Sequence, residues 1–148
     1  MTTFPVGDGG PRPTVSMLRA VTLVIGLWYL TFGLLGFVTT SNSMGADPSR
    51  SVWVFGVSAL VNLGHTGVGV MGVLAARAEE TTRAFGWLAF FGFTGLTAYG
   101  ILAVTVSPLG NLANVYAANV VLYGVSAVLG LLLCLLPVQP ESRAGPRD

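Results

Sequence analysis

The feature that most constrains the fold is a long stretch without a single charged side chain, residues 84–139. A helix that crosses a bilayer needs about 20 apolar residues, because each residue rises about 1.5 Å and the hydrocarbon core is about 30 Å thick. The stretch is too long for one crossing, so the chain must turn within it. Residues 107–111 read Ser-Pro-Leu-Gly-Asn, and proline and glycine break helices. We therefore predict two membrane-spanning helices here, over residues 84–106 and 115–136.

Two further apolar runs precede this stretch, at residues 20–38 and 52–76. Only 9% of the chain is charged, against roughly 25% in soluble proteins, so a water-soluble fold is not expected. The sequence predicts an all-α integral membrane protein. Its four-transmembrane-helix bundle covers residues 20–136, between tails at residues 1–19 and 137–148.

The positions of the arginines predict the orientation in the membrane. The arginines near the predicted inner ends are Arg12, Arg19, Arg77, Arg83, Arg143 and Arg147, and only Arg50 falls on the other side. Because short loops rich in arginine stay cytoplasmic, both termini are expected in the cytoplasm. The chain has no lysine, which fits a GC-rich bacterial genome, so we expect a bacterial plasma membrane. The apolar runs contain no basic residue that could form a groove for nucleic acid.

The two halves of the apolar region resemble each other. The matching residues are Trp28, Phe32, Gly33 and Gly36 in the first run with Trp87, Phe91, Gly92 and Gly95 in the third, and Asn62 and Gly67 in the second with Asn119 and Gly124 in the fourth. Both halves cross out and back, so the repeat is a parallel one, a layout found in some transporters. Chance similarity of glycine-rich helices is the alternative. We favour a duplicated two-helix hairpin, because the spacing recurs in two separate pairs of runs.

Small residues are expected to form the contacts between these helices. They are Gly33, Gly36, Gly72, Gly92, Gly95 and Gly130, together with Ala76 and Ser126. In lipid, helices associate through close backbone approach and not through hydrophobic expulsion, so faces rich in small residues are packing surfaces. A compact bundle is predicted.

One histidine lies near the middle of the second run. His65 follows Asn62 by about one helical turn, and Asn119 would lie at the matching depth if the halves are duplicated. An ionisable group at that depth is costly and normally faces the bundle interior. Three interpretations stay open: a neutral hydrogen-bonded clamp between the hairpins, a protonatable site in a transport or sensing mechanism, and a ligand to haem or metal, which needs a second strong ligand.

Signals for catalysis are weak. Residues 67–72 spell G-x-G-x-x-G, but that dinucleotide motif works only between a strand and the start of a helix, whereas this copy lies deep inside an apolar run. No carboxylate lies in a predicted span, and the lone Cys134 cannot form an intramolecular disulfide or a cysteine metal cage. We predict no enzymatic activity and no cofactor or metal.

Three stretches resemble the domain of unknown function 4383 family, four-helix membrane proteins of actinobacteria. They are residues 33–37 (Gly-Leu-Leu-Gly-Phe), residues 61–65 (Val-Asn-Leu-Gly-His) leading to residues 74–77, and Asn119 with Gly124. The resemblance covers roughly residues 18–133 and implies the fold without implying an activity. The chain departs from the family pattern at Val61, Ala118 and Leu122, where members often have His, Asp and His. If those groups formed a ligand or proton site in relatives, most of it is lost here.

These observations lead to three hypotheses about function. The leading one is a non-enzymatic membrane protein, an accessory or structural subunit that packs against other membrane proteins or a second copy of itself. The second is a small transporter or channel that uses Asn62, His65 and Asn119. The third is a redox subunit associated with haem or quinone.

Overall fold

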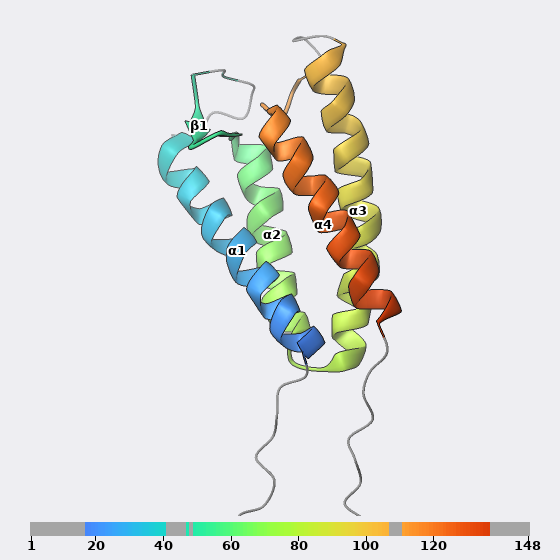
Figure 1. Ribbon diagram of the computed structural model, residues 1–148. Helices are drawn as coiled ribbons and strands as arrows, with labels where there is room; N and C mark the ends of the chain where they lie inside the picture. Colours follow the sequence, from blue (N-terminus) through green and yellow to red (C-terminus); the bar gives the residue numbers. More distant parts are fainter. Residues whose placement is uncertain (1–16, 41–46, 48, 107–110, 137–148) are drawn as a thin grey trace, which may run out of the picture.

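The computed structural model describes residues 17–40, 47, 49–106 and 111–136. In these residues the chain forms four helices and one small β-hairpin (Figure 1). The helices are α1 (Met17–Thr40), α2 (Ala59–Ala75), α3 (Glu79–Thr105) and α4 (Ala117–Leu135), and the strands are β1 (Ser51–Val52) and β2 (Phe55–Gly56). Residues 107–110 of the predicted turn at 107–111 and most of both predicted tails lie outside the described residues, while residues 17–19 belong to α1.

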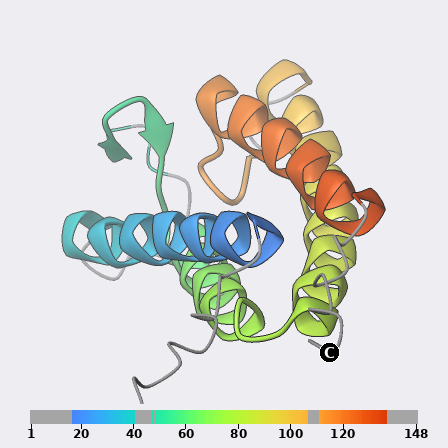
Figure 2. The same ribbon diagram turned by 60° about the horizontal axis from the view of Figure 1, so that its bottom comes forward.

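The four helices pack as two antiparallel pairs, α1 with α2 and α3 with α4. Figure 2 shows the pairs side by side, joined by the short turn between α2 and α3. The start of α1, the α2–α3 turn and the end of α4 lie at one end of the bundle, which we call the inner end, and the β-hairpin lies at the other, the outer end (Figure 1). The contact between α2 and α3 is much smaller than the contact within each pair.

Each pair has a point where two glycines let the backbones meet. A Cβ atom added to Gly26 of α1 would lie 2.8 Å from the carbonyl carbon of Gly72 in α2. In the other pair, a Cβ atom on Gly130 of α4 would lie 2.8 Å from the carbonyl oxygen of Gly86 in α3. Any larger residue would force the helices apart, so these glycines set the crossing distance of each pair.

An arginine closes the inner end of each pair. Arg19 of α1 donates from Nε to the carbonyl oxygen of Ala76, 2.9 Å away, just past the end of α2. Arg83 of α3 donates to the carbonyl oxygens of Cys134 and Leu136 at the end of α4, at 2.8 and 2.9 Å. The last carbonyls of a helix have no intrahelical hydrogen-bond partner and carry partial negative charge. A guanidinium there supplies both hydrogen-bond donors and a positive charge.

Three of the helices, α1, α3 and α4, are long and apolar enough to cross a membrane. Helix α2 is apolar but has only 17 residues. The predicted helix over residues 52–76 is therefore too long at its outer end, because residues 52–56 belong to the β-hairpin. Helix α2 begins where the Ser58 side chain accepts a hydrogen bond from the backbone N–H of Val61, the usual N-cap arrangement.

Aromatic side chains fill the space where the two pairs meet. The rings of Tyr29 (α1) and Phe93 (α3) stack with centroids 5.0 Å apart, and Tyr123 (α4) stacks on Phe93 at 5.9 Å. His65 of α2 lies against Tyr29 at 5.2 Å. All four helices thus contribute to this centre, which is almost fully buried. Around it, many large apolar side chains on all four helices are exposed.

Candidate functional site

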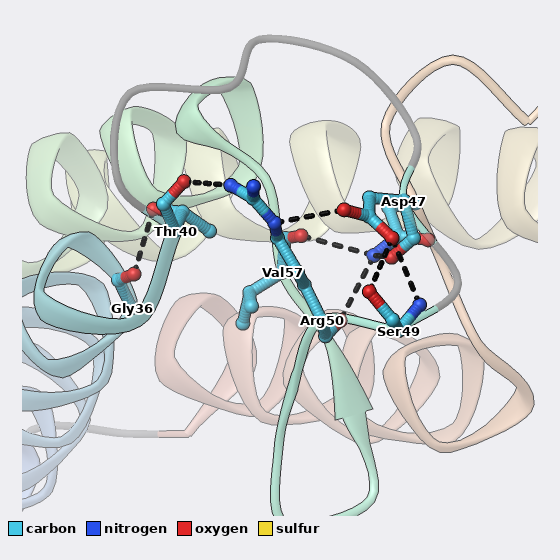
Figure 3. A network of polar contacts seen from close by, with 7 residues as sticks. Gly36, Thr40, Asp47, Ser49, Arg50 and Val57 are labelled. Atoms are coloured by element: carbon cyan, nitrogen blue, oxygen red, sulfur yellow. Dashed lines mark hydrogen bonds and ion pairs between the residues drawn. The ribbon is translucent and has the colours of Figure 1, made fainter.

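The outer end of the molecule holds a network of polar contacts (Figure 3). Asp47 forms an ion pair with Arg50, whose Nε lies 2.8 Å from the carboxylate. Arg50 also donates a hydrogen bond to the carbonyl oxygen of Thr40, the last residue of α1. The hydroxyl and the backbone N–H of Ser49 both donate to Asp47, at 2.6 and 3.0 Å. These hydrogen bonds from Ser49 hold the pKa of Asp47 below its usual value, with Arg50 acting in the same direction.

Asn114, in the segment before α4, ties this loop to the second helix pair. Its Nδ2 group lies 2.9 Å from the carbonyl oxygen of Asp47 and 3.0 Å from those of Arg50 and Val57, and donates to them. Asn114 is 1% exposed and has a φ of 55°, a left-handed conformation that asparagine tolerates better than most residues. The outer loop of the first pair is therefore fastened to the second pair by one amide.

Asn119 makes a second contact between the pairs, and it is the residue that the sequence singled out. Its Oδ1 accepts from the backbone N–H of Gly56 at 2.8 Å, and its Nδ2 donates to the carbonyl oxygen of Gly56 at 3.1 Å. The same Oδ1 accepts from the N–H of Tyr116, which caps the start of α4. The Asn119 amide thus pairs with the backbone of β2 as a neighbouring strand would.

Asn62 serves contacts inside the first pair. Its Nδ2 donates to Oγ1 of Thr40 in α1 at 3.0 Å, and its Oδ1 lies against Gly36, where any Cβ atom would collide with the amide. Gly33, one turn earlier in α1, lies in the same way against Thr66. Neither Oδ1 of Asn62 nor Oγ1 of Thr66 has a conventional hydrogen-bond partner among the described residues. Both face glycine backbone, where Cα–H groups are weak donors.

His65 occupies the aromatic centre. Its Nε2 lies 3.4 Å from the hydroxyl of Tyr123, while its Nδ1 has no partner among the described residues. The rings of Phe32 and Tyr29 lie 5.6 and 5.2 Å from the imidazole. His65 is 3% exposed.

The predicted polar cluster is therefore divided into three contacts. Asn62 joins α1 to α2, His65 approaches α4, and Asn119 binds the β-hairpin. The side chain of Asn119 also interacts with that of Tyr123, whose hydroxyl lies 3.4 Å from Nε2 of His65, so Asn119 is linked to His65 through Tyr123. A functional cluster of the three residues stays a prediction.

The predicted packing glycines also divide into two groups. Gly33, Gly36, Gly72 and Gly130 all lie against a neighbouring helix of the chain. In contrast, Cβ atoms added to Gly92 and Gly95 of α3 would have no atom within 4 Å. These two glycines do not contribute to packing among the described helices, because their face of α3 points away from α4.

An apolar groove runs between α2 and α3 beside Gly92. It has a volume of about 130 Å³, and its walls include Val68 and Met71 of α2 and Phe85, Leu88, Gly92 and Leu96 of α3. A second hollow, bordered by Leu74 and Thr81, shares Met71, Phe85 and Leu88 with the first and extends it toward the inner end. The groove follows the contact between α2 and α3, which is much smaller than the contact within either pair.

Sequence reasoning missed Asn114 and the contact between Tyr29 and Ser126, whose oxygens lie 2.6 Å apart. Asparagine within a turn segment is a signal that could have drawn attention to Asn114. The Tyr29 contact joins residues 97 positions apart, and nothing local indicates it. Among the described residues, no group of three His, Cys, Asp or Glu side chains is placed to hold a metal ion.

Comparison with known proteins gives one match. The family model described as domain of unknown function (DUF4383) matches residues 19–136. No curated protein matches the chain, and no solved structure does.

Proposed function

The chain belongs to the DUF4383 family, whose function is unknown, and from this premise we propose that it is a non-enzymatic accessory subunit of a bacterial plasma membrane. In this proposal it crosses the bilayer four times, keeps both termini in the cytoplasm, and packs against another membrane protein or a second copy of itself. Its partners are protein helices and lipid, not nucleic acid.

The distribution of arginine supports the proposed topology. Arg19 and Arg83 close the inner ends of the two pairs, and Arg77 lies in the turn between α2 and α3. Arg50, at the outer end, has its charge balanced by Asp47. An inner end richer in arginine is the cytoplasmic end by the positive-inside rule. Three long apolar helices, with α2 as the fourth crossing, complete this arrangement.

The similarity of the two pairs supports the proposed duplication. Each pair crosses at two glycines, Gly26 with Gly72 and Gly86 with Gly130. Each also has an arginine of its first helix bonded to the carbonyls that end its second helix. We infer that both pairs derive from one two-helix hairpin.

The observation that carries the accessory role is the open side of α3. Gly92 and Gly95 leave a strip of backbone uncovered, and Gly92 also lines the groove between α2 and α3. Glycine inside a helix costs about 0.5–1 kcal/mol relative to alanine. In lipid, this cost is usually offset by the packing of another helix close to the glycine backbone. The neighbouring Leu88 and Phe91 are half-exposed or more, so the strip has apolar flanks suited to a helix from another protein.

The test is to co-purify the chain with its partner and then block this side. A tagged chain is extracted from native membranes in mild detergent, and stoichiometric partners are identified by mass spectrometry. The double variant Gly92→Leu/Gly95→Leu fills the strip and is expected to lose the partner, or the second copy, while the four helices still fold.

The matched control is Gly64→Leu/Gly67→Leu on α2. Cβ atoms at these two positions also meet no atom within 4 Å, but neither residue lines the groove. This variant should keep the partner. A wild-type chain that purifies alone and as a monomer would contradict the accessory role.

One observation favours the transporter alternative. Nδ1 of the buried His65 has no hydrogen-bond partner among the described residues. It can therefore form a hydrogen bond with a transported solute. If His65 is part of a pathway, His65→Ala should abolish pH-dependent flux in liposomes. Unchanged flux would remove His65 from any mechanism. The haem or quinone alternative stays a prediction that the absorption spectrum and the extracted lipids of the purified protein would test.

A further inference from the structure

The turn between β1 and β2 presents two apolar side chains to the outside. The strands pair through Ser51 with Gly56 and Val52 with Phe55, which leaves only Trp53 and Val54 in the turn. Trp53 is 77% exposed and Val54 is 64% exposed. The turn of the β-hairpin therefore exposes apolar side chains.

The backbone at this turn is unfavourable for tryptophan. Trp53 has a φ of 56°, in the left-handed region that two-residue turns normally fill with glycine or asparagine. A bulky residue at positive φ is a genuine outlier, and such strain is found where a side chain has a function. The turn itself does not require a tryptophan at this position, so the surroundings of the ring must account for it.

The β-hairpin lies beside the helix ends and not beyond them. The ring of Phe55 packs edge-on against Phe32 of α1, with centroids 4.9 Å apart. Phe32 lies eight residues before the end of α1 at Thr40, which is about 12 Å along the helix axis. In Figure 1 the β-hairpin extends no farther outward than the end of α3. Its turn is thus at the level where the spans end.

The charge and length of neighbouring elements fit a lipid environment. Residues 51–56 carry no charge, and the charges of the adjacent Asp47 and Arg50 are paired with each other. Helix α2 has 17 residues, about 26 Å, which is shorter than the hydrocarbon core of about 30 Å. The β-hairpin stands at the outer end of α2, where the apolar surface of this crossing would otherwise stop.

We propose that the β1–β2 hairpin inserts into the interfacial region of the outer leaflet and that Trp53 is its lipid contact. Tryptophan is enriched at this depth because its ring is apolar while its N–H can reach water and headgroups. The occupant of this surface is the phospholipid bilayer itself. The inference rests on the proposed topology, so its experiment contains an internal reference for that topology.

The experiment places two single-tryptophan proteins in phosphatidylcholine vesicles. Trp28→Phe/Trp87→Phe keeps only Trp53, and Trp28→Phe/Trp53→Phe keeps only Trp87, which lies on α3. Lipids brominated near the headgroup or deep in the acyl chain quench tryptophan by contact, and iodide quenches from water. Trp53 should be quenched most strongly by the shallow bromines and protected from iodide.

Each other outcome has a distinct meaning. If Trp87 is quenched by brominated lipid and Trp53 only by iodide, the proposal is overturned and the topology stands. If Trp53 is shielded from both quenchers, a protein covers the turn and the lipid contact is also overturned. If brominated lipid quenches neither tryptophan, the topology itself fails.

A second probe keeps all tryptophans. Val54→Cys in a Cys134→Ser background carries a nitroxide spin label, whose collision rates with oxygen and with an aqueous nickel complex report depth. Oxygen should be favoured over nickel at Val54. A label at Val54 that collides mainly with nickel would contradict insertion even if a tryptophan variant had failed to fold.

Discussion

The two helix pairs both pack through glycines, but the first helix of each pair uses a different face for this contact. In the first pair, Gly33 and Gly36 of α1 lie directly against Thr66 and Asn62 of α2. In the second pair, the residues at matching sequence positions, Gly92 and Gly95 of α3, lie open. The same spacing of residues therefore makes an internal contact in one pair and an exposed surface in the other.

The difference follows from a shift of one residue. The glycines that form the crossings, Gly86 and Gly130, lie 60 and 58 positions after Gly26 and Gly72. The sequence repeat instead matches residues 59 positions apart in the first helices and 57 in the second. One residue rotates a side chain by about 100° around a helix. Glycines at matching sequence positions can thus face a neighbouring helix in one pair and lie open to a partner in the other.

The largest expected effect is at these glycines. Gly36→Ala places a methyl group on the amide of Asn62, so it should lower the free energy of unfolding by about 1–3 kcal/mol. Gly95→Ala, its match in the second pair, meets no atom and should leave stability unchanged or raise it by up to about 1 kcal/mol. Unfolding by SDS in micelles, followed by circular dichroism, gives both values. Equal losses at Gly36 and Gly95 would mean that the two pairs use the same face.

The next effect compares the two matching asparagines. Asn119→Ala removes three hydrogen bonds, two of them to the backbone of Gly56, at a total cost of about 1–3 kcal/mol. Asn62→Ala removes one hydrogen bond to Thr40, worth about 0.6 kcal/mol in a membrane protein.

The same SDS titration measures both asparagine variants. Asn119→Asp keeps Oδ1 as an acceptor but replaces the donor with a buried carboxylate oxygen that faces the carbonyl oxygen of Gly56, so it should be at least as damaging as Asn119→Ala. If Asn62→Ala proves the more damaging of the two, the assigned roles of the asparagines are reversed.

Much of the fold was predictable because apolar composition and helix length are local properties. Three helices long enough to span a membrane, the break near residue 107 and the family were all predicted from the sequence. The β-hairpin was not, because Val52, Trp53, Val54 and Phe55 read as the continuation of an apolar run. Strands of two residues are too short to show the alternation that marks a strand.

The candidate site was harder to predict because it depends on helix rotation. Sequence placed Asn62, His65 and Asn119 at comparable depth, but depth does not determine which face a side chain uses. Asn119 and Tyr123 lie one helical turn apart on α4, and it is the hydroxyl of Tyr123 that lies next to His65. The contacts of Asn119 depend on a β-hairpin that has no signal in the sequence.

A smaller effect on stability is expected from the polar contacts between the two pairs. Tyr29→Phe removes a buried hydrogen bond of 2.6 Å to Ser126 between α1 and α4, so it should cost about 0.6–1.7 kcal/mol. Tyr123→Phe removes the long contact of 3.4 Å to His65 and the interaction of the hydroxyl with Asn119 of the same helix, so it should weaken the contact between the pairs less. Both variants keep the aromatic stack on Phe93, so the difference isolates the hydroxyl groups. A larger loss for Tyr123→Phe would contradict the role of the Tyr29–Ser126 hydrogen bond as the main polar link between the pairs.

The smallest effect is a pH dependence that belongs to the outer loop of the first pair. Hydrogen bonds from Ser49 lower the pKa of Asp47 in the folded protein, so folding favours the ionised carboxylate. The stability that this adds is present above the ordinary carboxyl pKa near 3.8 and is lost as pH falls through the lower folded value. Asp47→Asn should therefore reduce the dependence of the unfolding midpoint on pH between about pH 5 and pH 2. Because Asp47 lies at the surface, the change should be small and should shrink further in high salt. A steep loss of stability in acid that persists in Asp47→Asn would place the responsible group elsewhere and remove this difference between the two pairs.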